Sequence, residues 1–544
     1  HPLGMVDDNL MKRYSDNVKI FANAYVSVEL MKGLKYKLNL TPDFQFYRYN
    51  SYEGLFDFGL AKHDITAVTE QQTRTRNILV ENLLTFDRTF GDHKVSALVG
   101  YTYQDSRYRY MQGSGQGMPT GITEIDAASQ GLAVSGNSSR SVLTSILGRA
   151  FYSYKNRYLL TATIRRDGSS KFGSNYRYGN FPSVSVGWNI AEEDFVKNSV
   201  SWLDQLKLRG GYGVLGNQEI DNYQYVSVVT TGINYPDGKS GLIQGAFPKT
   251  FANPDIKWEE TAMTNVGIDF MALRNRLTLT ADWYVKNTKD ILLNVPIPIS
   301  TGGANDPIRN AGKIRNQGFE FNLGWNESLN KDLSYGVSFL GTYNKNEVVE
   351  MGAESQVITG GTIHGGTYTS RTLAGYPIGG FWLIPTDGYF NSTEEVQAHQ
   401  KDGVLIQPSA EPGDIRFKDT NNDGTINDED RVYCGSPFPK FTYSINGNIT
   451  YKNVDFSIGF QGVTGNKIYN ATKLELTDVT RGTNYLASTL DYWTPENQNA
   501  SSPRLIWTDP NRNARSESDR YLESGSYFLS LIHISEPTRR VVIS

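Results

Sequence analysis

Cysteine is nearly absent from this chain, whose 544 residues include only Cys434. A single thiol excludes an internal disulfide framework and a cysteine-cluster metal site. The six histidines are scattered, and no two of them stand at the spacing of metal ligands on one helix face. Because no nucleophile, base or metal-ligand constellation emerges, we assign no catalytic residue and expect a protein that is not an enzyme.

Long apolar runs are also missing, since no stretch approaches the roughly 18 residues that a membrane-spanning helix needs. This excludes helical membrane spans but not a transmembrane barrel, whose alternating strands average out on a hydropathy scale. Charge is balanced as well, with a net charge of −4 and no long runs of one sign. We therefore expect no nucleic-acid partner.

No signal peptide is recognisable at the start of the chain, which reads His1-Pro2-Leu3-Gly4. A barrel has to be exported, and export requires such a signal. The sequence therefore predicts a mature or incomplete portion of a longer protein.

Apolar and polar residues alternate through most of the chain, most clearly between Phe441 and Phe460. Every second residue up to Tyr451 is apolar or glycine, and the alternation resumes after the short turn Lys452-Asn453. Successive side chains of a strand point to opposite faces, so this pattern predicts a hairpin with one apolar and one polar face.

Two kinds of connection join the predicted strands. Short ones lie near Met31–Leu34, Phe90–His93, Tyr154–Arg157, Ala272–Arg276, Glu327–Asp332 and Lys452–Asn453, with a slightly longer one at Glu192–Trp202. Long polar segments lie between them, at roughly 51–70, 111–139, 167–178, 216–257, 294–310, 349–437 and 467–524. Short periplasmic turns and long extracellular loops are typical of outer-membrane barrels.

The predicted fold class is therefore all-β, a transmembrane antiparallel β-barrel, with about 14–15 strands in this chain. A soluble all-β array or propeller is the alternative. It explains the alternation, but not the regular succession of short turns and long loops, and segment 349–437 would be unusually long for a compact domain.

An acidic loop follows the calcium-site spacing, with Asp419, Asn421, Asp423, Thr425, Asn427 and Asp430 at positions 1, 3, 5, 7, 9 and 12. Gly424 at position 6 lets the loop turn sharply, and Thr425 would contribute its backbone carbonyl. Asp430 replaces the usual glutamate and is one methylene shorter, which weakens the predicted site. The alternative is a turn rich in Asp and Asn that is held by side-chain-to-backbone hydrogen bonds.

Aromatic residues in the long loops are candidate ligand contacts, because sugars stack their apolar faces on aromatic rings. The substrate-binding candidates are Tyr376, Phe381, Trp382 and Tyr389 in segment 349–437, and Tyr492 and Trp493 in segment 467–524. Loop packing or contact with a partner protein is the alternative for each of them.

Gly211-x-Gly213-x-x-Gly216 matches a dinucleotide-binding fingerprint by letter, but it lies within an alternating strand and precedes no helix. We interpret these glycines as positions where strands pack closely or where a plug lies close to the strand.

Several stretches together resemble one known family. They include GRAFYSYKNRYLLTATIRRDGSSKFG at 148–173, LKLRGGYGVLGNQEIDNY at 206–223, NPDIKWEETAMTNVGIDF at 253–270 and PGDIRFKDTNNDG at 412–424. With further matches between about residues 16 and 528, the chain resembles the SusC/RagA family of TonB-dependent outer-membrane transporters of Bacteroidetes.

The resemblance implies a 22-stranded barrel that is closed by an N-terminal plug and covered by a SusD-like surface lipoprotein. It also implies the outer membrane as the location, energy from TonB, and an oligosaccharide or glycan as the imported ligand. A peptide importer of the RagA type is an alternative, as is a passive pore or adhesion barrel without energy coupling.

The sequence departs from this family at both ends. No plug or TonB box precedes residue 1, so we expect residues 1–528 to be a partial barrel. Residues 529–544 lack strand alternation and the family's ending, and we expect this tail to be an artefact.

Overall fold

The structure is a computed structural model that describes residues 10–59, 62–236, 238, 241–295, 300, 306–352, 357–363 and 366–534. The chain divides into two compact units, described separately below. Unit 1 contains residues 1–188, 211–261 and 290–310, and unit 2 contains residues 189–210, 262–289 and 311–544. Among the described residues, no helix is both long and apolar enough to cross a membrane.

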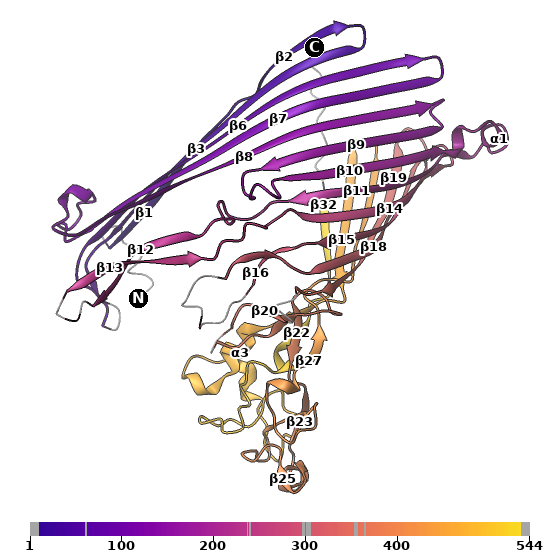
Figure 1. Cartoon of the computed structure of the whole chain (residues 1–544). Coiled ribbons are helices and arrows are strands. Elements are labelled where there is room, and N and C mark those ends of the chain that lie inside the picture. The colour runs from indigo at the N-terminus through magenta and orange to yellow at the C-terminus, as the bar shows by residue number, and fades with distance from the viewer. Residues whose placement is uncertain are drawn as a thin grey trace. The chain divides into compact units, whose positions relative to one another are not determined.

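Unit 1 is built from long antiparallel strands that follow one another in the chain (Figure 1). They are β1 (Met11–Phe21), β2 (Ala24–Met31), β3 (Leu34–Glu53), β6 (Ala67–Phe90), β7 (His93–Gln116), β8 (Gln130–Tyr154), β9 (Tyr158–Ser169) and β10 (Tyr178–Asn189). The hydrogen-bonded order is β1-β3-β6-β7-β8-β9-β10, and β2 also pairs with β3. Short elements in its connections are β4 (Phe56–Asp57), β5 (Lys62–His63), η2 (Ile125–Ala127), β12 (Val228–Pro236), β13 (Leu242–Thr250), β16 (Leu292–Asn294) and β17 (Ile308–Asn310).

Unit 2 repeats the arrangement with β15 (Leu277–Lys289), β18 (Lys313–Ser328), β19 (Leu333–Glu350), β28 (Phe441–Tyr451), β29 (Val454–Thr464) and β32 (Tyr527–Ile534), hydrogen-bonded in that order. It also holds η3 (Ile190–Glu192) and α1 (Asp194–Lys197). Strands β11 (Leu203–Asn217) and β14 (Glu259–Ala272) have residues in both units. All six predicted short turns, and the longer one predicted at Glu192–Trp202, lie between successive strands, so this prediction is confirmed.

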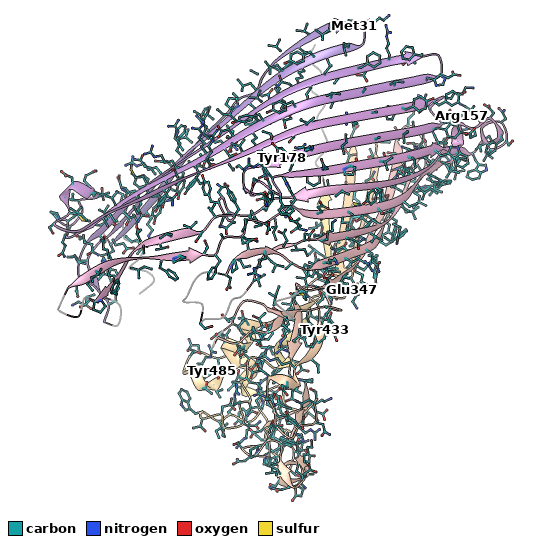
Figure 2. The ribbon with its side chains drawn as sticks, in the orientation of Figure 1. Met31, Arg157, Tyr178, Glu347, Tyr433 and Tyr485 are labelled. Atoms are coloured by element: carbon teal, nitrogen blue, oxygen red, sulfur yellow. The ribbon has the colours of Figure 1, made fainter. Side chains whose placement is uncertain are left out.

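Cross-strand register confirms the predicted alternation of faces, and side chains project from both faces of the strands (Figure 2). In unit 1, one face carries the row Leu84, Val99, Gly148 and Ile164, and the other carries Glu81, Thr102, Ser145 and Asp167. In unit 2, the corresponding rows are Leu279, Leu323, Phe339, Ile445 and Phe460 on one face and Asp282, Glu320, Thr342 and Thr442 on the other. One face is thus fit for lipid and the other for water, as a membrane barrel requires.

The first predicted strand, around residues 20–30, is interrupted. β1 and β2 pair with different parts of β3, and the gap between them faces Pro42. Proline has no backbone N–H to donate to a ladder. Here the Pro42 carbonyl still accepts from the Ala22 N–H at 3.1 Å, while the Asn23 side chain bonds to Thr41.

The end of the chain also differs from expectation. β32 continues to Ile534 and pairs with β29 as far as Phe456, so the strand extends past the predicted boundary at 528. Residues 535–544, the rest of the predicted artefactual tail, lie outside the described residues.

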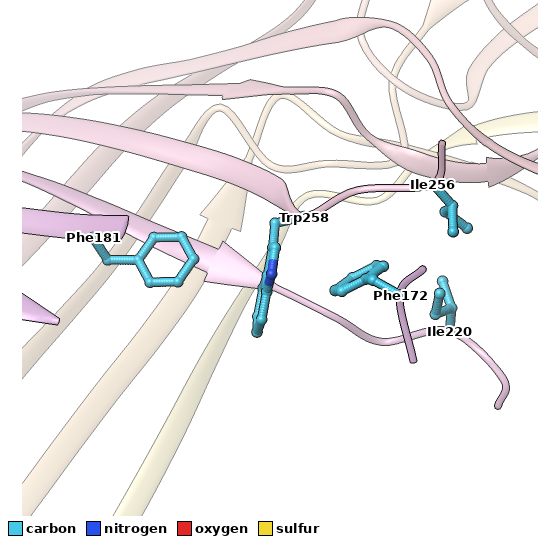
Figure 3. Packing of buried hydrophobic residues seen from close by; sticks show 5 residues of the cluster. All are labelled: Phe172, Phe181, Ile220, Ile256 and Trp258. Carbon is cyan, nitrogen blue, oxygen red and sulfur yellow. The ribbon is translucent and has the colours of Figure 1, made fainter. Parts of the chain in front are cut away.

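A small core of buried hydrophobic residues lies in unit 1, formed by Phe172, Phe181, Ile220, Ile256 and Trp258 (Figure 3). Trp258 packs between Phe172 and Phe181 with ring centroids 5.1 and 5.3 Å apart, and its indole N–H donates to the Arg177 carbonyl at 3.1 Å. A Cβ on Gly216 would lie 2.1 Å from the Phe181 ring. Gly216 therefore serves close packing of β11, as interpreted from the sequence.

Candidate functional site in the long loops of unit 2

The two longest loops of unit 2 fold together into one body, here called the loop module (the described residues of 357–440 together with 465–526). It contains β20 (Ile358–Thr359), β21 (Ser370–Thr372), β22 (Gly380–Leu383), β23 (Thr386–Tyr389), α2 (Thr393–Ala398), β24 (Gln400–Lys401), β25 (Val404–Leu405), β26 (Ile415–Phe417), η6 (Asp428–Asp430) and β27 (Val432–Gly435). The second loop adds β30 (Lys467–Tyr469), α3 (Ala471–Thr477), η7 (Val479–Arg481), η8 (Ala487–Leu490), η9 (Asp519–Tyr521) and β31 (Leu522–Ser524). Figure 1 shows these elements gathered beyond β19.

A buried apolar core and backbone pairing hold the loop module together. Ile384, Ile415 and Phe417 are at most 2% exposed and pack against one another. The Ile384 N–H donates to the Glu517 carbonyl at 2.8 Å, which joins the first loop to the second. The candidate residues in this region therefore sit on folded structure.

A buried ion pair also connects the two loops. Asp414 is fully buried and accepts from Arg504 through both carboxylate oxygens, at 2.6 Å from Nε and 3.0 Å from Nη2. The Asn513 side chain donates to the same carboxylate at 2.8 Å, and the Glu411 N–H donates at 2.9 Å. Asp414 and Arg504 are 90 residues apart in the sequence, so no local spacing signalled this pair.

Three rings meet where the first loop leaves β19. Tyr376 lies 4.9 Å from Trp382 in an edge-on contact and 5.1 Å from Tyr433, and Trp382 lies 6.0 Å from Tyr433. We call these three residues the aromatic cluster; Tyr433 is labelled in Figure 2. All three are partly exposed, and the buried Trp382 Nε1 has no hydrogen-bond acceptor in the described structure.

Two of the cluster's members, Tyr376 and Trp382, were predicted from the sequence, whereas Tyr433 was missed. Its strand β27 pairs with β22, which places Tyr433 directly opposite Trp382. Only that long-range pairing brings the ring to the cluster. Burial, together with the neighbouring Tyr376, raises the pKa of Tyr433, so its hydroxyl is neutral at physiological pH.

The other aromatic candidates occupy different surroundings. Trp493 is 5% exposed and donates its indole N–H to the Asn391 side chain at 3.0 Å, and its ring leaves no room for a Cβ on Gly413. It therefore packs inside the module and offers no free face for stacking. Tyr389 packs against the Ile384 core, and burial raises its pKa. Phe381 is half-buried on β22, and Tyr492 is exposed.

The predicted calcium loop is a tightly wound turn. Asp419 accepts from the N–H groups of Asp423 and Gly424 at 3.0 and 2.8 Å, and Asp423 accepts from the Thr425 N–H at 2.7 Å. Gly424 has φ = +91°, the left-handed conformation that glycine adopts without strain. Hydrogen bonds from Asn421, Thr425 and Asn427 lower the pKa of Asp423 to about 2.

Asp430 has a structural role in this turn. Its side chain is fully buried, and its two oxygens accept from the N–H groups of Thr420 and Asn427 at 2.7 and 2.8 Å. Within the described residues, no three His, Cys, Asp or Glu side chains converge as ligands of one metal ion. The remaining oxygens of Asp419, Asn421 and Asp423 keep spare lone pairs, so calcium binding by this loop stays a prediction.

Together these features define a class of protein. Strands with one apolar and one polar face, short turns at one end and long folded loops at the other are the construction of a transmembrane β-barrel. The loops carry the residues that could meet a ligand.

Comparison with known proteins agrees with this class. Residues 9–532 match the family model "TonB dependent receptor-like, beta-barrel". The chain is similar to TonB-dependent receptor P3 of Formosa agariphila, with 30% identity over 97% of this chain and 51% of that protein. It is also similar to TonB-dependent receptor SusC of Bacteroides thetaiotaomicron, with 33% identity over 61% of this chain and 32% of that protein.

The chain belongs to the β-barrel family of TonB-dependent receptors, as its resemblance to the SusC/RagA receptors predicted. Its fold is similar to that of the solved RagAB peptide transporter, with a TM-score of 0.81, 21% identity and coverage of 96% of this chain and 55% of the other. The chain spans about half the length of the curated relatives that it matches over most of its own length. Its family places it in the outer membrane.

Proposed function

We propose that the protein containing this chain imports an oligosaccharide across the outer membrane, using energy supplied through TonB. Membership of the TonB-dependent receptor family carries this proposal. The aromatic cluster of the loop module supports a sugar as the ligand. Its three rings are partly exposed, and a partly exposed aromatic ring can stack on the apolar face of a sugar.

A binding experiment on the purified receptor in detergent tests the ligand class. We expect calorimetry to detect one or more oligosaccharides from a panel, and Trp382→Ala to weaken that binding about three- to tenfold, the loss typical of one aromatic contact. Phe438→Ala is the matched control, because Phe438 is an exposed aromatic residue outside the aromatic cluster. Binding of peptides but not of sugars would favour the RagA-type alternative.

Energy coupling is tested by uptake in cells. A TonB-dependent importer loses uptake when TonB is removed, whereas a passive pore continues to conduct. Unchanged uptake in cells without TonB would therefore contradict the proposed importer and favour the passive pore or adhesion barrel.

A SusD-like lipoprotein is the proposed partner of the loop module. Apolar side chains are exposed on its second loop, with Leu490 at 77% and Trp507 at 62%, and exposed apolar residues are typical of protein contacts. Co-purification of such a lipoprotein with the receptor, and its loss in Leu490→Asp, is the expected result. If the lipoprotein co-purified with the Leu490→Asp variant as well as with the unmodified receptor, Leu490 would be excluded from the contact.

A further inference from the structure

Six arginines gather on four neighbouring strands of unit 1: Arg48 on β3, Arg74 and Arg76 on β6, Arg107 and Arg109 on β7, and Arg140 on β8. They line two adjoining grooves of about 520 and about 430 Å³, and Arg74 and Arg109 line both. These arginines are dispersed along the sequence, so the alternation of apolar and polar residues did not reveal that they form one group. We call this group the arginine patch.

Register places the arginine patch on one face of the sheet. Arg74 lies directly opposite Arg109, and Arg76 lies opposite Arg107. Arg107 in turn lies opposite Arg140. Residues that face each other across paired strands, and residues two apart on one strand, share a face.

The same face becomes apolar along the same strands towards the short turns. On β6, Arg74 and Arg76 are followed on that face by Ile78, Val80, Asn82 and Leu84, and on β7 Arg107 is preceded by Asp105, Tyr103, Tyr101, Val99 and Ala97. An apolar band bordered by aromatic residues is the lipid-facing surface of a membrane barrel. The arginine patch therefore lies on the outer wall, just beyond the apolar band on the side of the long loops.

The carboxylates near the patch balance only part of its charge. Asp105 lies 2.9 Å from Arg140, 3.3 Å from Arg107 and 3.8 Å from Arg76. Glu70 pairs with Arg48 at 3.1 Å, and Asp16 lines the larger groove. Six guanidinium groups thus face three carboxylates, a surplus of three positive charges.

Arg74 and Arg109 lie apart from these carboxylates and carry part of the surplus charge. Among the described residues, the ion pairs of the patch involve Arg48, Arg76, Arg107 and Arg140, and neither Arg74 nor Arg109 has a carboxylate within salt-bridge distance. Arg74 lies over the Phe46 ring, 5.6 Å from its centroid, as a cation–π pair. Like charges directly opposite on paired strands destabilise a sheet. An anion between the two side chains would turn this repulsion into attraction.

We propose that the arginine patch binds the phosphate-bearing headgroup of a lipid in the outer leaflet of the membrane. Guanidinium groups bind phosphate oxygens through two parallel hydrogen bonds, which suits several arginines converging on one headgroup. The apolar band next to the patch receives the acyl chains of the same lipid. A soluble phosphate would gain nothing from that band, and basic sites beside apolar surface are typical of lipid headgroup recognition.

Native mass spectrometry of the intact receptor containing this chain, purified in detergent, tests the proposal. The probes are lipid A with both phosphates, the same lipid A after enzymatic removal of its phosphates, phosphatidylcholine, and inorganic phosphate. We expect retention of phosphorylated lipid A at least tenfold above the dephosphorylated form and phosphatidylcholine. Competition by inorganic phosphate should be weak, since it offers no acyl chains.

The decisive variant is Arg74→Gln/Arg109→Gln, because neither side chain holds a carboxylate of the protein. We expect about a tenfold or greater loss of lipid A retention, as each charge-assisted hydrogen bond contributes roughly one factor of ten. The melting temperature should be unchanged or higher, since a like-charge pair is removed. The control Lys94→Gln/Arg149→Gln removes two positive charges from the opposite face of β7 and β8, and it should retain lipid A as the unmodified receptor does.

Equal retention of phosphorylated and dephosphorylated lipid A would overturn the proposal, as would undiminished retention by Arg74→Gln/Arg109→Gln. Binding of inorganic phosphate as tight as that of lipid A would assign the patch to soluble anions instead. None of these results depends on ligand import, so failure here is distinguishable from failure of the proposed function.

Discussion

The ion pair between Asp414 and Arg504 allows a quantitative prediction about the loop module. Arg504→Ala leaves a fully buried carboxylate without its cation. Loss of one partner of such a pair typically costs about 3–5 kcal/mol. The Asn513 and Glu411 donors remain, so we expect the lower end, about 3 kcal/mol.

Hydrogen exchange of the detergent-solubilised receptor measures this loss locally. An opening free energy lowered by about 3 kcal/mol corresponds to roughly 100-fold faster exchange. We expect it at Ile415–Phe417 in the first loop and around Asn513 in the second, while β6 and β7 stay protected. Both loops should respond together, because the pair joins them.

Two variants sharpen the prediction. Arg512→Ala is the control: its side chain is 65% exposed and lies 3.1 Å from Glu517, so removing it should cost no more than about 1 kcal/mol. Asp414→Asn/Arg504→Ala should be milder than Arg504→Ala alone, because the orphaned charge is gone. Less than threefold faster exchange in Arg504→Ala, or a response confined to one loop, would refute the reasoning.

Three further predictions concern other parts of the chain. Burial raises the pKa of Asp519 in the folded module above its value in the unfolded chain. The stability that Asp519 contributes is therefore present at low pH and is lost as the pH rises through the pKa of the folded state. Asp519→Asn, whose amide oxygen can still accept from Thr386, should therefore be neutral or stabilising at pH 7. Asp519→Ala should lose about 1–3 kcal/mol, measured by the exchange rate of the Thr386 amide; equal destabilisation by both would contradict this account. Calcium should bind the loop around Asp419, as followed by terbium luminescence. Asp423→Ala should abolish this binding, whereas Asp428→Ala should preserve it. An unchanged luminescence signal in Asp423→Ala would exclude this loop as the calcium site. Gly216→Val should cost about 1–3 kcal/mol of thermal stability through overlap with Phe181, whereas Gly361→Ala, with nothing within 4 Å, should be tolerated; equal melting temperatures would show that the Phe181 ring yields.

The strands could be predicted from the sequence because their information is local. A side-chain period of two places Leu279 and Ala281 on one face whatever the partner strand is. Short turns such as Lys452-Asn453 sit between segments whose alternation simply resumes, so their positions are visible without a structure. The break between β1 and β2 was missed because its cause, Pro42, lies on the neighbouring strand.

The long loops resisted prediction for the opposite reason. Their stability comes from contacts between residues far apart in sequence, such as Asp414 with Arg504 and Trp382 with Tyr433. Composition marked Trp493 as a ligand candidate, but burial against Gly413 makes it a packing residue. Asp430 fits a calcium spacing by letter, yet its carboxylate closes the turn by accepting from two backbone amides.

The sequence by itself therefore determined the class of fold, the face of each strand residue and the family. Tertiary structure alone decided which loop residues meet, and that the arginines of β3, β6, β7 and β8 converge on one wall. The physical reason is that strand faces follow from the chain's own geometry. Convergence of side chains, in contrast, depends on the register between strands, which many residues fix together.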